Sequence, residues 1–182
     1  MKKFPLEKAF TLIEPGPVIL VTTADNRGMN IMTISWSMVL DFTPRFALMT
    51  GPWNHSYKAL KKTKECVLAI PGVDLAKKVI GIGTCSGAEV NKFDKFKLTP
   101  VEAKSVGAPL IAECLANIEC RVVDYIAKHG IFVLDAVNAW VNLDRKERRT
   151  FHAVGDGTFV VDGRRLNFRK LMKEKIPSGA CT

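Results

Sequence analysis

Residues 30–37 combine polar and aromatic side chains in a pattern that can contact a ligand. The run reads N-I-M-T-I-S-W-S and is rich in residues that favour β-strands. Alternate side chains of a strand point to opposite faces, so one face carries Asn30 and Trp36. The other face carries the hydroxyl groups of Thr33 and Ser35. Two interpretations of Trp36 stay open: it packs in the core of a barrel strand, the commoner place for tryptophan, or it borders a ligand.

Other patterns that carry chemistry are weak. The glycines at 81, 83 and 87 do not match the G-x-G-x-x-G spacing of a dinucleotide loop, and they follow a helical segment instead of opening one. There is no G-x-S-x-G elbow and no Walker-type loop. Cys85 is the one thiol to consider as reactive, but no base stands near it in the sequence. The three histidines share no metal-ligand spacing; they are His55, His129 and His152. We therefore expect no catalytic side chain and no metal site.

The elements around these residues predict an antiparallel β protein with a few helices. Turn residues separate β-rich runs at 17–23, 29–36, 45–51, 66–70, 117–127 and 131–141. Helices are expected at 57–62, capped by Asn54 or Ser56, and at 73–82, followed by a glycine-rich loop over 81–87. Open strand edges pair promiscuously, so such strands usually close into a barrel. A small barrel is filled by its own side chains, which places a ligand on its outside or at a subunit contact.

Length and charge limit the class of protein. The 182 residues fit one domain, and no apolar window is long enough to span a membrane, so we expect a cytoplasmic protein. Five cysteines without a C-x-x-C pair suggest reduced thiols. The net charge of +9 attracts anions of every kind. Much of the positive charge falls at 145–149 and in the tail at 164–175. We interpret the tail as an amphipathic helix or a covering segment.

Four motifs in order resemble the flavin reductase-like, FMN-binding split-barrel family, and within it flavoredoxins most closely. They are N-I-M-T-I-S-W at 30–36, N-H-S-Y at 54–57, S-G-A-E-V-N-K-F at 86–93 and H-G-I-F-V at 129–133. The resemblance covers about residues 15–163. It implies a mainly β fold, a Greek-key split β-barrel of six or so antiparallel strands with flanking helices. It also implies a homodimer that holds FMN in a groove between subunits.

The resemblance assigns roles to residues of the first motif. Asn30 matches the asparagine that helps to hold the phosphate end of FMN. Thr33 and Ser35 match small polar positions of the same strand, and Trp36 matches the aromatic position beside the flavin. Met32 belongs to the same set of candidate cofactor-binding residues.

The later motifs supply the rest of the candidate set. Asn54 and Ser56 match a polar pair near the ribityl phosphate, and Lys92 matches the lysine that reaches the phosphate. His129 matches the histidine between the two long strands. Thr50 and Phe151 complete the set, Phe151 as a rough match to an aromatic near the flavin ring. The basic segment at 164–175 has no counterpart that we can match.

These residue types suit FMN chemically. A phosphate requires ammonium, hydroxyl and amide donors, which Lys92, Ser56 and Asn30 can supply, and a flat ring suits Trp36. Hydride transfer is the cofactor's own reaction, so no catalytic side chain is needed. We expect an oxidoreductase that takes electrons from NAD(P)H or from a small acidic redox protein. The alternatives are a basic barrel that binds nucleic acid without catalysis, which the late clustering of the charge disfavours, and a split barrel with haem on His129 or His152.

Overall fold

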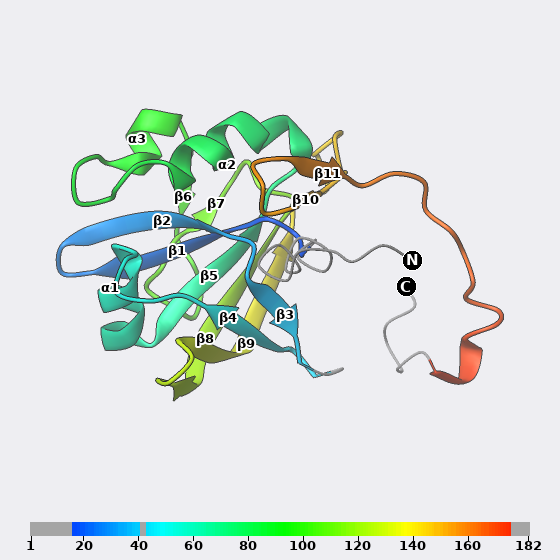
Figure 1. Cartoon of the computed structure of the whole chain (residues 1–182), viewed down its shortest axis with the longest axis horizontal. Coiled ribbons are helices and arrows are strands. Elements are labelled where there is room, and N and C mark those ends of the chain that lie inside the picture. The colour runs from blue at the N-terminus through cyan, green and yellow to red at the C-terminus, as the bar shows by residue number, and fades with distance from the viewer. Residues whose placement is uncertain (1–15, 41–42, 176–182) are drawn as a thin grey trace, which may run out of the picture.

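The body of the protein is one curled antiparallel sheet (Figure 1). The computed structural model describes residues 16–40 and 43–175. The order of the seven strands is β2-β1-β5-β8-β9-β4-β3. Their bounds are β1 Ile19–Asp25, β2 Gly28–Ile34, β3 Ser37–Val39, β4 Arg45–Met49, β5 Glu65–Ile70, β8 Ala116–Ile126 and β9 Ile131–Val141. The six predicted strands are confirmed, and β3 adds a seventh.

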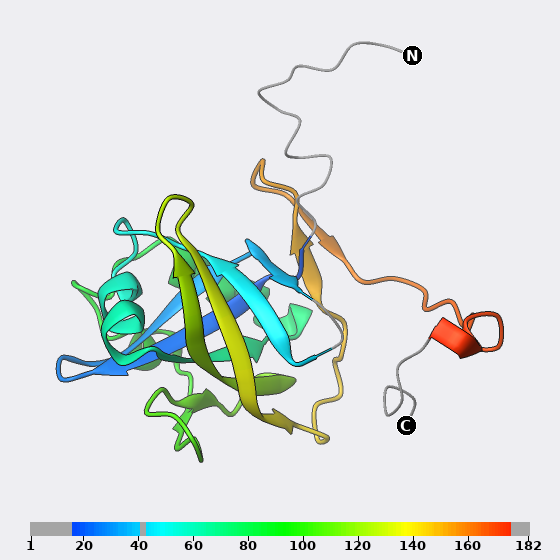
Figure 2. The ribbon, with the colours of Figure 1, turned by 90° about the horizontal axis from the view of Figure 1, so that it is seen from below.

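The sheet closes at one end and is split at the other. Strands β2 and β3 form its two opposite edges, yet only Ser35 and Trp36 connect them. A link this short spans at most about 11 Å, so the two edges must converge where it lies. Figure 2 shows the resulting curl, with the long β8–β9 hairpin running across the open barrel. The expected split barrel is therefore the observed fold.

Side chains alternate between two cores along β1 and β2. Ile19 and Val21 point into the barrel interior, which also holds Met32 and Ile34 from β2. Leu20 belongs to a second core between the outer face of the sheet and the helices. The period of two places β1 and β2 between two apolar layers, and a shift by one residue would exchange the side chains of those layers, so the register of both strands is fixed.

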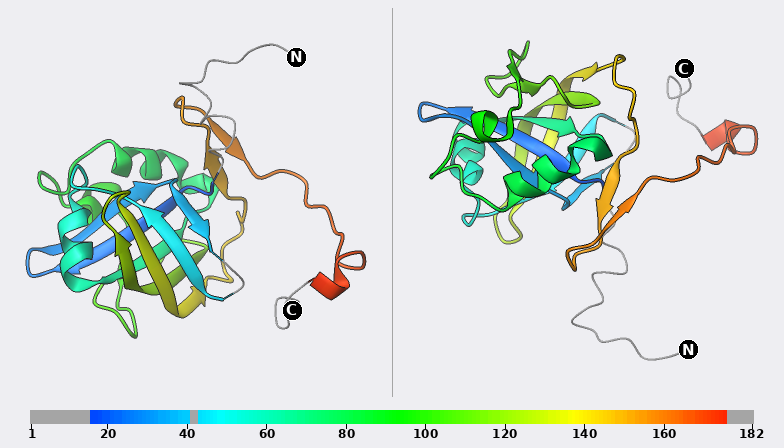
Figure 3. Two further views of the ribbon diagram at one scale, coloured as in Figure 1. Left: turned by 60° about the horizontal axis from the view of Figure 1, so that its bottom comes forward. Right: turned by 90° about the horizontal axis from the view of Figure 1, so that it is seen from above.

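Helical elements pack against both faces of the sheet. They are α1 Ser56–Thr63, the 3₁₀ turn η2 Val73–Leu75, α2 Ala76–Gly83 and α3 Lys92–Phe96. The 3₁₀ turn η2, α2 and α3 cover the outer face of the sheet, whereas α1 packs Leu60 into the barrel interior from the other side. Both predicted helices are present. The predicted start of the glycine-rich loop at Gly81 is wrong, because α2 continues through Gly81 and ends at Gly83. Figure 3 shows α2 and α3 lying together over the β2 end of the sheet.

A buried carboxylate fixes the segment between α3 and β8. Glu119 is fully buried and accepts hydrogen bonds from the Lys104 N–H (3.1 Å), the Ser105 N–H (2.6 Å) and Trp140 Nε1 (2.6 Å). Burial raises the pKa of Glu119, but these hydrogen bonds outweigh it and hold the pKa below its usual value. The same segment carries a short ladder of β6 (Pro100–Val101) and β7 (Leu110–Ile111).

The C-terminal tail leaves the body of the protein. A hairpin of β10 (Phe151–Ala153) and β11 (Phe159–Val161) packs at the sheet, and the chain beyond it extends outward (Figures 1 and 2). The amphipathic helix expected there is wrong: the helical part of the tail is the 3₁₀ turn η3 at Lys173–Lys175. Leu166, Phe168 and Leu171 are all more than half exposed, so the tail covers none of the body within the described residues. Without an apolar surface to pack on, a short helix is not stable by itself.

None of the helices in the described residues combines the length and the apolar character needed to cross a bilayer.

Candidate cofactor-binding site

Two predicted site residues meet at the edge of the sheet. Asn30 lies on the edge strand β2, and Ser56 is the first residue of α1. The Asn30 Nδ2 donates to Ser56 Oγ at 2.8 Å, and both residues are buried. On β1, Thr23 pairs with Asn30 across the β1–β2 ladder. Its buried hydroxyl has no hydrogen-bond partner among the described residues. The polar cluster therefore has one hydrogen-bonding group that its own residues do not satisfy.

No side chain caps the start of α1, because the polar residues there bond elsewhere. The N-cap residue is His55, and no side chain caps the helix, so the predicted cap by Asn54 or Ser56 is wrong. Asn54 Nδ2 instead donates to Thr50 Oγ1 at 3.0 Å. A helix start without a side-chain cap, at the positive end of the helix dipole, is a kind of place where anions bind in proteins.

The loop after α2 closes over the same edge from the other side. Gly87 approaches Asn30 so closely that a Cβ at position 87 would lie 2.1 Å from Asn30 Oδ1. Thr33 points to the opposite face of β2, where its hydroxyl donates to the Val79 carbonyl at 2.6 Å. Its methyl-bearing Cβ lies against Gly83. Thr33 therefore ties β2 to α2, and Gly87 walls the Asn30 cluster.

Lys92 is buried between α2 and α3. Its Nζ donates to the carbonyl of Ile82 at 2.8 Å, near the C-terminal end of α2. Burial lowers the pKa of the Lys92 ammonium, and the neighbouring Cys85 acts in the opposite direction. One of its three protons is used by Ile82, which leaves donors for a second acceptor. Its contact with a phosphate stays a prediction.

Trp36 borders an apolar pocket instead of packing in the core. Its side chain is 53% exposed, so the core interpretation is wrong. The physical reason is a tight turn: β2 ends at Ile34, and the Ser37 N–H bonds the Ser35 carbonyl at 3.0 Å. That turn rotates Trp36 away from the face it would occupy on a continuing strand. The pocket has a volume of about 240 Å³ and is lined by Trp36, Ser37, Met38, Ala47, Met49 and Ile131.

Three other candidate residues lie at different depths. Phe151 is 1% exposed and stacks edge-on against Phe159, which places it inside the core beneath the β10–β11 hairpin. Met32 is also buried, with its sulfur 3.9 Å from Thr50 Oγ1. His129 is exposed in the β8–β9 turn. That turn lies beside the site, because the Thr50 N–H donates to the Gly130 carbonyl at 3.0 Å.

Three residues near the site were not predicted from the sequence as site residues. They are Thr23, Gly87 in its close contact with Asn30, and Trp53. Trp53 is 65% exposed, and its ring lies over Gly51, where a Cβ would come within 2.2 Å of Cζ3. An aromatic residue in the G-P-W-N loop ahead of α1 was the available signal for Trp53. No sequence pattern indicated Thr23, because whether a buried hydroxyl has a hydrogen-bond partner depends on the packing around it.

Comparison with known proteins shows the family of this chain. The model of the flavin reductase like domain matches residues 13–158. The chain belongs to the flavin reductase-like family. YddH of Escherichia coli (strain K12) is 30% identical over 178 residues, which cover 88% of this chain and 94% of YddH. A protein of Archaeoglobus fulgidus is 41% identical over 107 residues, 57% of this chain and 60% of its own length.

Solved structures share the fold. Flavoredoxin of Desulfovibrio vulgaris (Miyazaki F) superimposes with a TM-score of 0.82 at 24% identity, over 92% of this chain and 96% of that one. Flavoredoxin from Methanosarcina acetivorans gives 0.78 at 19% identity, over 97% and 99%. An FMN-binding protein from Thermus thermophilus gives 0.77 at 20% identity, over 92% and 99%.

The residues of this flavin reductase-like chain fit FMN. A phosphate needs donors without a competing carboxylate, which the uncapped start of α1, with no acidic residue in its first turn, provides. The apolar pocket at Trp36 suits a flat ring. By contrast, no group of three metal-ligating side chains occurs within residues 16–40 and 43–175.

Proposed function

We propose that this protein binds FMN noncovalently along the β2 edge and acts as a flavin-dependent oxidoreductase. One observation carries the proposal: Thr50 links the polar residues ahead of α1, through its hydrogen bond with Asn54, to the neighbouring Met49, which lines an apolar pocket with an exposed tryptophan. This pairing matches a ligand that has a phosphate at one end and an aromatic ring at the other.

The side chains have separate tasks in this proposal. Ser56 and the first turn of α1 bind the phosphate, and Asn30 orients the Ser56 hydroxyl through their hydrogen bond. Asn54 and Thr50, bonded to each other, form the next part of the groove. Trp36 contacts the ring. Bound FMN supplies the site for accepting and donating electrons, so the protein positions the ring and excludes water.

A second copy of the chain completes the groove in this proposal. Exposed apolar side chains follow the Trp36 pocket onto β3 and past its end; they are Trp36, Met38, Val39 and Leu40. Such a contiguous patch favours a protein contact over open solvent. A dimer at micromolar concentration, with and without FMN, is the expected result of light scattering, and a monomer that still holds FMN would contradict it.

The electron donor in this proposal is NAD(P)H or a small acidic redox protein. A flavin reductase must admit the nicotinamide over one face of the ring, whereas a flavoredoxin-type carrier needs only a docking surface. The half-exposed Trp36 and the shallow pocket beside it leave room for a donor on one side.

The visible spectrum of the purified protein is the first test. We expect a yellow protein that releases FMN on mild denaturation. A colourless protein that takes up no added FMN refutes the proposal, and a haem spectrum would replace it.

A matched pair of variants tests the phosphate end. Ser56→Ala removes the hydroxyl at the first residue of α1, and Thr63→Ala removes one at its last residue. A lost charge-assisted hydrogen bond weakens binding by about 1.5–3 kcal/mol, roughly 10- to 150-fold. We expect this for FMN with Ser56→Ala, little change for riboflavin, and little change for either ligand with Thr63→Ala. Equal weakening of FMN and riboflavin would mean that Ser56 does not contact the phosphate.

A further inference from the structure

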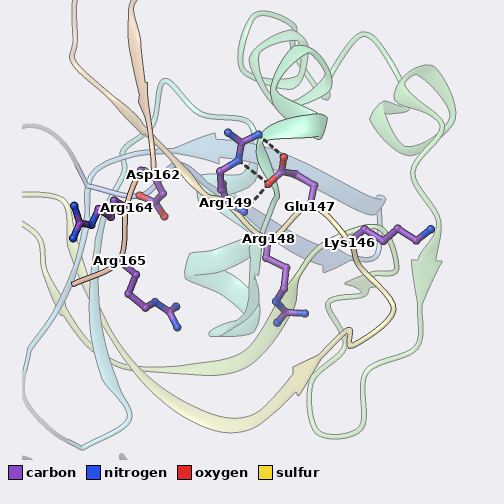
Figure 4. Close-up of a pocket in the computed structure, with 8 residues that line it drawn as sticks. Lys146, Glu147, Arg148, Arg149, Asp162, Arg164 and Arg165 are labelled. Carbon is purple, nitrogen blue, oxygen red and sulfur yellow. Dashed lines mark hydrogen bonds and ion pairs between the residues drawn. The ribbon is translucent and has the colours of Figure 1, made fainter. Parts of the chain in front are cut away.

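A second, strongly cationic cleft lies where the tail leaves the body (Figure 4). Its volume is about 590 Å³, and two chain segments form it, one before β10 and one after β11. Five cations and two carboxylates line it, which leaves three net positive charges; they are Lys146, Arg148, Arg149, Arg164 and Arg165 with Glu147 and Asp162. In Figure 4, Arg148 and Arg165 both extend away from Glu147 and Asp162.

The two carboxylates are already engaged by neighbours. Glu147 accepts two hydrogen bonds from the Arg149 guanidinium, of 2.9 and 2.6 Å, and one from the Arg149 backbone N–H of 3.0 Å (Figure 4). Asp162 accepts a hydrogen bond from the Thr150 hydroxyl and pairs with His152 Nε2 at 2.7 Å. The Arg149 guanidinium lowers the pKa of Glu147 to about 2, so this pair stays ionised at neutral pH.

The remaining cations of the cleft lack anionic partners. Lys146, Arg164 and Arg165 form no ion pair within residues 16–40 and 43–175, and Arg148 makes only a long bond of 3.4 Å to the Asn142 carbonyl. Like charges gathered without counter-charges repel, and a bound anion relieves that repulsion. Guanidinium groups bind phosphate in a fork, with two parallel hydrogen bonds.

We propose that this cleft binds the phosphate monoester group of a small ligand. The ligand is NADPH, and the group is its 2′-phosphate. The inference rests on the proposed function, which needs an electron donor. The cleft is concave and within the size range of small-molecule sites, which favours a phosphorylated small molecule over the flat face of an acidic protein.

The position of the cleft agrees with an extended dinucleotide. Asp162 in the cleft bonds His152, and His152 forms a backbone bridge with Pro17. Pro17 in turn lines an apolar groove together with Ser37 and Met38, which also line the Trp36 pocket. A chain of contacts through β10 and Pro17 therefore connects the cationic cleft to the proposed position of the flavin ring.

The test uses two double variants with the same change in net charge. Arg164→Gln/Arg165→Gln removes two cleft cations, and Arg169→Gln/Lys170→Gln removes two cations farther along the exposed tail. Binding of 2′-AMP, adenosine and inorganic pyrophosphate is measured by calorimetry in the full-length protein. Anaerobic reduction of the flavin by NADPH and NADH is measured in parallel.

We expect the wild-type protein to bind 2′-AMP but not adenosine, and to be reduced at lower concentrations of NADPH than of NADH. The cleft variant should lose about 10- to 100-fold in affinity for 2′-AMP and NADPH, with NADH unchanged. Pyrophosphate binding as tight as that of 2′-AMP would identify a general anion site and overturn the assignment to NADPH. Equal losses in both double variants would show long-range attraction instead of a site.

Failure of the inference and of the proposed function are distinguishable. If the protein binds FMN but shows no NADPH preference, or is reduced only by an acidic redox protein, the inference is wrong and the proposed function stands. If no FMN binds, the proposed function fails, while the 2′-AMP arm still reports on the cleft. Tight binding of RNA with no binding of 2′-AMP would also refute the inference.

Discussion

Gly87→Ala should damage the proposed flavin site through a steric contact with Asn30. A Cβ at position 87 would lie 2.1 Å from Asn30 Oδ1, 2.6 Å from Cγ and 2.8 Å from Nδ2. Carbon atoms do not approach other heavy atoms so closely, so the Asn30 amide must move. That movement breaks its 2.8 Å hydrogen bond to Ser56.

The size of the effect follows from that lost bond. A buried polar group left without its partner costs about 1–3 kcal/mol. Thermal or denaturant unfolding should show this loss in the protein without flavin. FMN affinity, measured by titration of the flavin spectrum, should fall by roughly 5- to 150-fold, because Ser56 loses the group that orients it.

A double-mutant cycle isolates the cause. Asn30→Ala removes the three atoms that the new methyl group meets, so adding Gly87→Ala to it should cost almost nothing further. Gly107→Ala is the control, since its Cβ would meet only Glu65 Oε2 at an ordinary 3.6 Å. If Gly87→Ala weakens FMN binding equally with and without Asn30, the steric reasoning is refuted.

Three further predictions concern a carboxylate, a lysine and a thiol. Glu119→Gln should destabilise the protein by about 1–3 kcal/mol at pH 7, because an amide cannot accept from all three buried donors. The pKa of Glu119 is lowered on folding, so its contribution is complete above about pH 4.5 and is lost as the pH falls through the lowered pKa. Unfolding curves should thus lose acid sensitivity in Glu119→Gln but not in the surface variant Glu102→Gln. Lys92→Met should weaken the binding of FMN but not of riboflavin if the ammonium reaches the phosphate. Equal binding of FMN by the variant and the wild type would mean that Lys92 contacts only the Ile82 carbonyl and not the phosphate. In a Cys181→Ser background, a maleimide should label the half-buried Cys85 first, since the three other thiols are fully buried; labelling of Cys114 at an equal rate would contradict the fold.

The order of the strands along the chain could be predicted from local patterns. Runs such as 117–127 and 131–141 alternate and are separated by turn residues, and those signals depend only on neighbours in sequence. Residue types also indicated which segments contact a ligand, because hydroxyl, amide and aromatic groups recur in four short motifs. The boundaries were less certain, and α2 continues through glycines that suggest a loop.

The tertiary structure decided how those segments meet and which side chains remain open. Trp36 belongs to the β2 face by its spacing, but the turn at Ser35 directs it outward, and the connection to β3 at the opposite sheet edge imposes that turn. Phe151 looked like a ring contact, but the β10–β11 hairpin packs it into the core. The tail has the composition of an amphipathic helix and lacks a surface to pack on.

Composition and short-range spacing therefore determined the strands, the family resemblance and the kinds of chemistry in this chain. The pairing of Asn30 with Ser56, the wall at Gly87 and the cationic cleft required the fold, since each joins residues at least 13 positions apart in sequence. Side-chain exposure depends on the packing of distant segments, and local sequence does not encode it directly.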